Sequence, residues 1–207
     1  MLLSIIYINI FFGTTNYIDI LYSPNLVFSK QEQLLLWLGF FISFAVKVPM
    51  YPFHIWLPEA HVEAPTSGSM ILAGLLLKLG GYGFIRFSLS LFPYASSYFS
   101  SFIYTLAIVS IIYSSCVALI QTDFKKVIAY SSIAHMNMSI LGLFSNNLYG
   151  LYGSCILMLG HGIISIALFF LVGCIYDRHH ERSIDYYGGL TLVNPILSFF
   201  FFFFYYF

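Results

Sequence analysis

Four titratable side chains lie deep within apolar stretches of this sequence: Lys47, Lys78, His135 and His161. Histidine gains and loses a proton near neutral pH, and a lysine can do the same when its surroundings disfavour the charged form. A row of such groups, joined by water molecules, would pass protons from one member to the next. The chemistry that these residues indicate is therefore proton transfer through an apolar medium.

The composition shows which kind of molecule must hold these groups. Of the 207 residues, 60% are hydrophobic and only 8% are charged, whereas a soluble domain carries about 25% charged residues. Eight basic residues balance eight acidic ones, so no positive excess points to a nucleic acid. These values exclude a cytosolic globular enzyme, a disordered chain and a nucleic-acid-binding protein, and they indicate an integral membrane protein.

The apolar stretches are the elements that must position the four groups. A helix needs about 20 apolar residues to cross a hydrocarbon core of about 30 Å. The sequence predicts an all-α, polytopic transmembrane bundle of about six to seven helices, forming a single region over residues 1–207. The four segments between residues 67 and 176 are predicted to be complete, unbroken spans. The predicted helical segments are 1–12, 34–48 (continuing brokenly towards residue 61), 67–91, 102–120, 127–144, 151–176 and 192–207.

The four groups are predicted to lie at similar depths on four different helices. Counted at 1.5 Å per residue from the start of each segment, Lys47 lies about 20 Å deep, Lys78 about 17 Å, His161 about 15 Å and His135 roughly 12 Å. Charged groups at such depths are costly and mark transport pathways. The alternative for each histidine is a hydrogen-bonded packing residue, which is a frequent role for a lone imidazole in a helix bundle.

Lys47 also stands beside a predicted break in its helix. Pro49 and Pro52 cannot donate backbone hydrogen bonds, so they interrupt the helix directly after this lysine. Irregular backbone at membrane depth is tolerated only where protein buries it or where it lines a wet cavity. Broken helices beside an ion site are a recurring device of transporters.

The stretch after the break carries four more titratable residues: His54, Glu59, His61 and Glu63. They indicate either a proton route towards the loop or a polar cap at the membrane interface, and the sequence favours neither. A metal site is not expected, because the His-Glu-x-x-His spacing of zinc proteases is absent. Cys116, Cys155 and Cys174 are predicted to be small buried hydrophobic residues.

Basic residues in the loops predict the orientation of the chain. Lys125, Lys126, Arg178 and Arg182 lie in loops that should share one side of the membrane. By the positive-inside rule, that side is the cytoplasmic or matrix side.

Long motifs in this sequence resemble the subunit 4 family of mitochondrial NADH dehydrogenase. The resemblance covers residues 33–190, and it is carried by FAVKVPMYPFHIWLPEAHVEAPTSGSMILAGLLLKLGGYGFIRFSLSLFP, QTDFKKVIAYSSIAHMNMSILGLFS, LMLGHGIISIALFFLVGCIYDRHHER and YYGGL. That family supplies an antiporter-like, proton-translocating subunit to the membrane arm of respiratory complex I. The resemblance implies a multi-pass protein of the mitochondrial inner membrane.

The resemblance also assigns expected roles to individual residues. Lys47 matches the family's lysine on the broken helix, Lys78 matches the lysine on the following helix, and His135 and His161 match histidines of the same hydrophilic axis. The sequence has neither a glycine-rich nucleotide loop nor a cysteine array. We therefore expect no cofactor on this chain, with NAD, FMN, iron–sulfur clusters and ubiquinone bound elsewhere in the complex, and no catalysis outside that complex.

The resemblance is confined to the central part of the family's sequence. The earlier helix that supplies a glutamate to the central lysine, and the later broken helix, have no counterpart here. We expect separate chains to supply these N- and C-terminal parts, with other membrane-arm subunits and membrane lipids as further partners. Two alternative functions remain open: a subunit of a monovalent cation/proton antiporter complex, and a non-pumping structural remnant in complex I.

Overall fold

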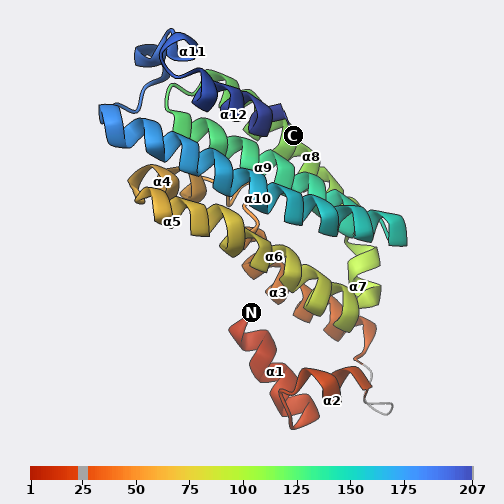
Figure 1. The fold of residues 1–207 in the computed structure, drawn as a ribbon. Coiled ribbons are helices and arrows are strands. Elements are labelled where there is room, and N and C mark those ends of the chain that lie inside the picture. Colours follow the sequence, from red (N-terminus) through yellow and green to blue (C-terminus); the bar gives the residue numbers. More distant parts are fainter. Residues whose placement is uncertain (23–27, 207) are drawn as a thin grey trace.

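A computed structural model describes residues 1–22 and 28–206, and almost all of this part of the chain is helical (Figure 1). The predicted all-α bundle with a proline-broken helix is confirmed. The helices are α1 (Leu2–Phe12), α2 (Tyr17–Tyr22), α3 (Lys30–Lys47), α4 (Trp56–Glu63), α5 (Thr66–Ile71), α6 (Leu77–Gly83), α7 (Pro93–Tyr98), α8 (Ser100–Ile120), α9 (Phe124–Leu143), α10 (Leu148–His179), α11 (Leu190–Val193) and α12 (Pro195–Tyr206), with π-helical turns at Leu72–Leu76 and Phe84–Leu89 and a 3-10 turn at Ile184–Tyr187.

The three longest helices form the body of the bundle. Helix α9 packs against both α8 and α10, and α4 and α5 lie along the same pair of helices, α9 and α10 (Figure 1). Helix α3 packs on α6, α1 packs on α3, and α12 packs on α10. Every helix that carries one of the four titratable groups therefore touches at least one other such helix.

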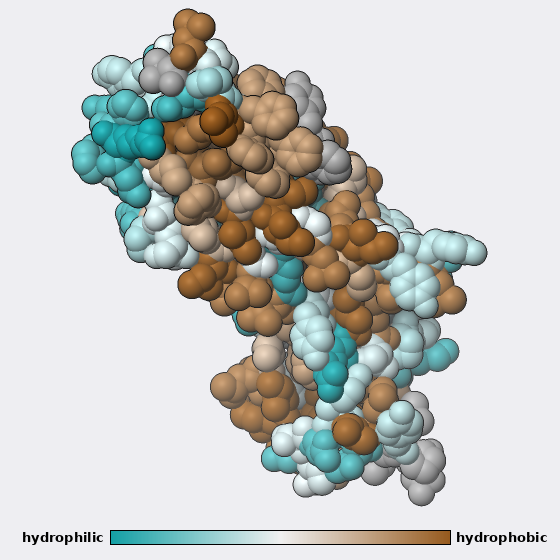
Figure 2. Space-filling view, in the orientation of Figure 1, coloured by the Kyte–Doolittle hydropathy of each residue, from teal (hydrophilic) through white to brown (hydrophobic). Residues whose placement is uncertain are grey.

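Three described helices are long and apolar enough to cross a membrane: Thr66–Leu89, Ser100–Ile120 and Leu148–His179. Three of the four segments predicted to be complete spans contain these helices, and the span predicted for α9 stays a prediction. Helix α9 has 20 residues, which is sufficient length, and Lys125, Lys126, His135 and Asn137 make it less apolar than the other three. Figure 2 shows hydrophobic side chains over much of the visible face and hydrophilic ones at the end where α10 finishes.

The break after α3 occurs where the prolines predicted it. The chain leaves the helix at Val48, whose φ and ψ of −89° and 90° are extended, and helical structure resumes at Trp56. Protein groups satisfy the backbone that the break exposes. The amide nitrogen of Asn137 donates to the Pro49 carbonyl at 3.2 Å, and the Tyr51 backbone N–H donates to the Ser110 hydroxyl at 2.7 Å.

Aromatic side chains fill the core beside α3. Trp37 is fully buried and stacks on Phe41 and Phe99, with ring centroids 4.8 and 4.7 Å away. Its indole N–H donates to the Ser96 hydroxyl at 3.1 Å, so the polar edge of the ring is satisfied. The prediction of buried cysteines is wrong for Cys116, which is exposed on α8, while Cys155 and Cys174 are half-buried.

Candidate functional site

One continuous helix, residues 66–89, carries Lys78 between two π-helical turns. The first turn, Leu72–Leu76, ends where the Leu77 backbone N–H donates to the carbonyl of Leu72, five residues earlier. Such π turns are rare, and they are frequent at functional sites because they re-aim the side chains that follow. Here the turn sets the direction in which α6 presents Lys78.

Lys78 contacts His161 of α10 inside the bundle. Its Nζ lies 2.8 Å from Nδ1 of His161, and it donates a second hydrogen bond to the Ala73 carbonyl at 2.5 Å. His161 is 9% exposed. Because Nδ1 accepts a hydrogen bond only when it carries no proton, one proton lies between these two nitrogen atoms.

His135 of α9 extends this contact to a third helix. Its ring centroid lies 5.8 Å from that of His161, with an angle of 38° between the ring planes. His135 is exposed on this chain, whereas its neighbour is buried. Helices α6, α10 and α9 thus contribute one titratable group each to a contiguous polar cluster of Lys78, His161 and His135.

Glycines allow α6 and α10 to approach closely around this cluster. A Cβ atom on Gly74 would collide with Ile166, and one on Gly81 would collide with Met158. A Cβ atom on Gly162 would lie 3.4 Å from Cε of Lys78. The lysine therefore reaches the histidine because small residues line the seam between the two helices.

The structure leaves Lys47 apart from this cluster. Lys47 is the last residue of α3, is exposed on this chain, and packs beside Gly80 on the other side of α6 from the His161 contact. Among the described residues the one ion pair joins Lys126 and Asp123, so Lys47 has no carboxylate partner there. Glu32 cannot serve, since it lies fifteen residues back on the same helix, about 22 Å away along its axis.

Glu32 is instead part of the start of α3, before the apolar portion of that helix. It forms a capping box with Ser29 and accepts a hydrogen bond from the Tyr7 hydroxyl of α1 at 2.7 Å. The hydrogen bonds from Tyr7 and Ser29 hold the pKa of the Glu32 carboxyl below its usual value. This residue ties α1 to α3 and has no contact with the polar cluster.

The four titratable residues after the break do not form one group. His54 is buried beside Tyr51 and Tyr113, with ring centroids 5.8 and 5.1 Å away. His61 is fully buried and stacks on Phe169 at 4.4 Å, and neither of its ring nitrogens has a hydrogen-bond partner within the described part of the chain. Glu59 and Glu63 are exposed. Whether this stretch is a proton route or a cap stays a prediction.

Two polar residues of α9 have structural roles that the sequence analysis missed. Asn137 is fully buried and bonds the Pro49 carbonyl at the break. Lys125 is 7% exposed and donates to the Ala64 carbonyl at 2.9 Å. An amide two residues after His135 in an apolar helix was an available signal for Asn137. For Lys125 the sequence offered only its place among the basic loop residues, which does not indicate burial.

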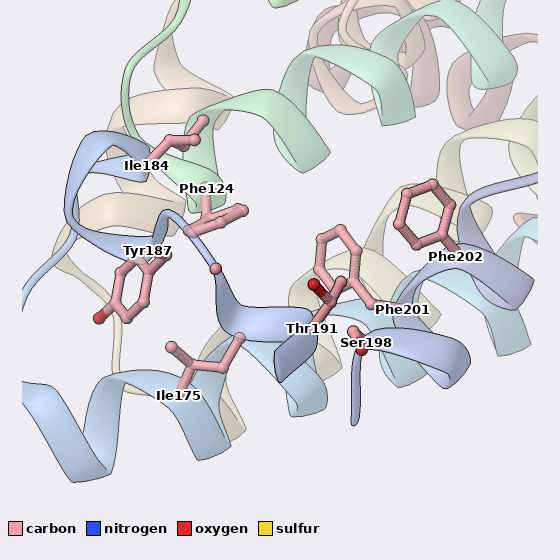
Figure 3. Close-up of a pocket in the computed structure, with 9 residues that line it drawn as sticks. Phe124, Ile175, Ile184, Tyr187, Thr191, Ser198, Phe201 and Phe202 are labelled. Atoms are coloured by element: carbon pink, nitrogen blue, oxygen red, sulfur yellow. The ribbon is translucent and has the colours of Figure 1, made fainter. Parts of the chain in front are cut away.

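An apolar cavity lies away from the polar cluster. It has a volume of about 360 Å³ and lies at the loop end of the bundle, where Phe124, Ile175 and Tyr187 face Phe201 of α12 (Figure 3). Its walls contain no lysine, histidine or carboxylate among the described residues. Burial and the nearby Glu181 carboxylate raise the pKa of the Tyr187 hydroxyl above its usual value. Because these titratable groups are absent from the described lining, the cavity is not part of the candidate proton path.

Comparison with known proteins places the chain in a family. The family described as NADH:quinone oxidoreductase/Mrp antiporter, TM, matches residues 1–206. The chain is 58% identical over 198 residues to NADH-ubiquinone oxidoreductase chain 4 of Marchantia polymorpha, covering 96% of this chain and 39% of that protein. The chain 4 protein of Triticum aestivum gives the same identity and coverage. This chain thus spans about two fifths of the length of the curated relatives it matches.

Solved structures share the fold. Respiratory complex I from Thermus thermophilus contains a chain that matches with a TM-score of 0.86 and 30% identity, covering 95% of this chain and 42% of that one. The Mrp complex from Dietzia sp. contains a chain with a TM-score of 0.86 and 20% identity, covering 97% of this chain and 37% of that one. At that identity the second match shows similarity of fold alone.

Proposed function

Because the chain belongs to the NADH:quinone oxidoreductase/Mrp antiporter transmembrane family, we propose that it works within a proton-translocating membrane subunit of respiratory complex I. In this role it moves protons across the mitochondrial inner membrane while quinone is reduced elsewhere in the complex. The curated relatives named above are NADH-ubiquinone oxidoreductase chain 4 proteins, which supports this assignment. The chain is one part of an H⁺-translocating NADH:ubiquinone reductase and has no catalysis of its own.

The observation that carries the proposal is the contact between Lys78 and His161. Their nitrogen atoms share one proton at 2.8 Å, between helices that span the apolar layer. When a neighbouring charge moves, the proton passes from the ammonium to Nδ1, and the imidazole then releases a proton from its other nitrogen. His135 is the next acceptor in this proposal, since its ring is the neighbouring imidazole, with centroids 5.8 Å apart. A water molecule can relay a proton over a gap too long for a direct hydrogen bond.

Lys47 is proposed to join this relay from the other side of α6. It lies directly before the break, and irregular backbone at membrane depth is found where protein buries it or where it lines a wet cavity. His54, His61, Glu59 and Glu63 are proposed to connect the relay to the loop side. The order of these steps is set by the coupling in the whole complex.

Cofactors and partners follow from this role as proposals. NAD, FMN, iron–sulfur clusters and ubiquinone are bound by other subunits, because this sequence has no nucleotide loop or cysteine array. Other membrane-arm subunits and lipids surround the bundle. Polypeptide outside this sequence, proposed to be separate chains, supplies the remaining parts of the subunit, and mass spectrometry of the purified complex identifies it.

The test replaces Lys78 in the assembled complex and measures the ratio of protons translocated to electrons transferred, in sealed vesicles. Met, which cannot be protonated, and Arg, which cannot be deprotonated in proteins, should both lower this ratio strongly while assembly survives. Lys126→Met is the control, since this half-exposed lysine pairs with Asp123 at 3.7 Å outside the cluster. Wild-type ratios in Lys78→Met would support a structural remnant, and sodium-dependent transport would support the cation/proton antiporter.

A further inference from the structure

Lys125 combines deep burial with a long-range hydrogen bond. It is the second residue of α9 and is 7% exposed. Its ammonium donates to the backbone carbonyl of Ala64, 61 residues earlier in the chain, at 2.9 Å. A lysine that remains buried requires such a partner, because an unpaired ammonium is costly away from water.

The carbonyl that Lys125 binds stands at a junction between two helices. Helix α4 ends at Glu63 with Ala64 as its C-terminal cap, and α5 begins at Thr66 directly after Pro65. Carbonyls at the end of a helix lack intrahelical partners and carry partial negative charge, so a cation there forms a favourable bond. Lys125 therefore caps α4 from a different helix.

The same lysine is held from the other side by the end of α10. Its ammonium lies 5.8 Å from the centre of the Tyr176 ring, and the guanidinium of Arg182 lies 5.4 Å from that ring. Of its charged neighbours, the Asp177 carboxylate favours the ammonium and the Arg182 guanidinium opposes it. A backbone hydrogen bond of 2.8 Å from the Ile184 N–H to the Thr122 carbonyl fixes the adjoining loop. Lys125 thus connects the α4–α5 junction to the corner where α9 begins and α10 ends.

The junction positions His61, which lies three residues before Ala64 in the last turn of α4. His61 is fully buried against Phe169 of α10, and its carbonyl accepts a hydrogen bond from the Ser69 hydroxyl at 3.2 Å. The ammonium of Lys125 is also the charge that acts on its ring. A displacement of the junction would move this histidine relative to α10.

We propose that Lys125 is a positioning residue that pins the α4–α5 junction to the ends of α9 and α10, and that proton translocation requires this pin. The proposal rests on the proposed function, because it concerns the same proton path. Lys125 is needed as a permanent cation bound to the Ala64 carbonyl, and it does not itself transfer protons.

The experiment compares Lys125→Met, Lys125→Arg and the matched control Lys126→Met in the assembled complex. The first readout is amide hydrogen exchange of residues 56–66, and the second is the proton-to-electron ratio. Lys125→Met should speed exchange at the junction several-fold and lower the ratio, because the carbonyl loses its cation. Lys125→Arg, which keeps a permanent cation and its donors, should restore both values, and Lys126→Met should change neither.

Three results would overturn the proposal. Unchanged exchange in Lys125→Met would show that there is no pin, and a wild-type ratio with fast exchange would show that translocation does not need it. A Lys125→Arg variant as defective in translocation as Lys125→Met would show that the lysine must release its proton. Failure of the proposed function is recognised separately, by a wild-type ratio in Lys78→Met.

Loss of the buried ammonium could also prevent the complex from assembling. If Lys125→Met prevents assembly, the same two readouts are taken on Lys125→Gln, whose amide still donates a hydrogen bond but carries no charge. Faster exchange with a lowered ratio then supports the pin, and wild-type values contradict it.

Discussion

At the scale of single residues, one proton lies in the hydrogen bond between Nζ of Lys78 and Nδ1 of His161. The ammonium also bonds the Ala73 carbonyl, so the lysine is held in place whichever nitrogen carries the proton. The imidazole of His161 has a second ring nitrogen from which a proton can leave, while Nζ is the one nitrogen in the side chain of Lys78. This asymmetry makes the histidine the member that can pass a proton onward.

Replacing the two histidines with glutamine should separate their roles. Glutamine keeps hydrogen-bonding groups but cannot titrate in the physiological range. His161→Gln should reduce turnover strongly, because it removes the partner of Lys78, and His135→Gln should reduce it less, because that ring has no direct contact with the lysine. The measurement is NADH:ubiquinone turnover against pH. If neither substitution alters the pH profile, both histidines are packing residues.

The sequence predicted which residues belong at a common depth but not which of them meet. Counting residues along each segment brought Lys78, His135 and His161 to similar levels, and the structure joins them. The same count placed Lys47 with them, because depth along a helix says nothing about which side of α6 it occupies. Lys125 and Asn137 were missed because their roles depend on carbonyls 61 and 88 residues away in the chain.

At the scale of elements, the end of α3 and the break after it approach α6 closely at Gly80. A Cβ atom there would lie 2.5 Å from Cγ2 of Val48 and 3.0 Å from its backbone nitrogen. The backbone nitrogen belongs to the start of the break and cannot move without disturbing it. These two elements can therefore lie this close together because Gly80 has no side chain.

Gly80→Ala should destabilise the assembled subunit. Overpacking of this kind costs about 1–3 kcal/mol, whereas alanine gains up to about 1 kcal/mol over glycine within a helix. The measurement is the midpoint temperature for thermal loss of turnover. Gly153→Ala on α10 is the control, since a Cβ atom there meets nothing within 4 Å. A midpoint for Gly80→Ala equal to that of the control would contradict the tight packing.

Helix positions were predicted well because apolar length and proline are local signals. The break after Lys47 and the segments on either side of it appear where the sequence placed them. Helix α9 is less apolar than the other predicted spans, and its sequence does not show what its polar residues contact. In the structure they bond other helices, which allows a less apolar helix to lie in the middle of the bundle.

At the scale of the whole molecule, the unpaired Lys47 indicates a missing neighbour. An ammonium in an apolar layer needs an opposite charge, since a desolvated ion without one costs several kcal/mol. Of the acids before it, Asp19 is exposed on α2 and Glu32 lies at the far end of α3. We therefore expect the compensating group to come from polypeptide outside this sequence.

A structure of the complete complex should show a carboxylate from such polypeptide near Lys47. The expected separation from Nζ is within about 6 Å, the range at which opposite charges favour ionisation. Replacing that carboxylate with its amide should lower the proton-to-electron ratio as Lys47→Met does. Lipid alone beside Lys47 in the complete complex would show that the inference is wrong.

The π-helical turns give the helix around Lys78 a change of phase. An α-helix turns by about 100° per residue, so one additional residue within a turn rotates everything after it by roughly that angle. With such turns at Leu72–Leu76 and Phe84–Leu89, no single helical wheel describes residues 66–89. The two α-helical stretches within it, Thr66–Ile71 and Leu77–Gly83, each have their own facing direction, and Lys78 belongs to the second. The buried face of this helix is therefore defined by where the extra residues sit as much as by which residues are apolar.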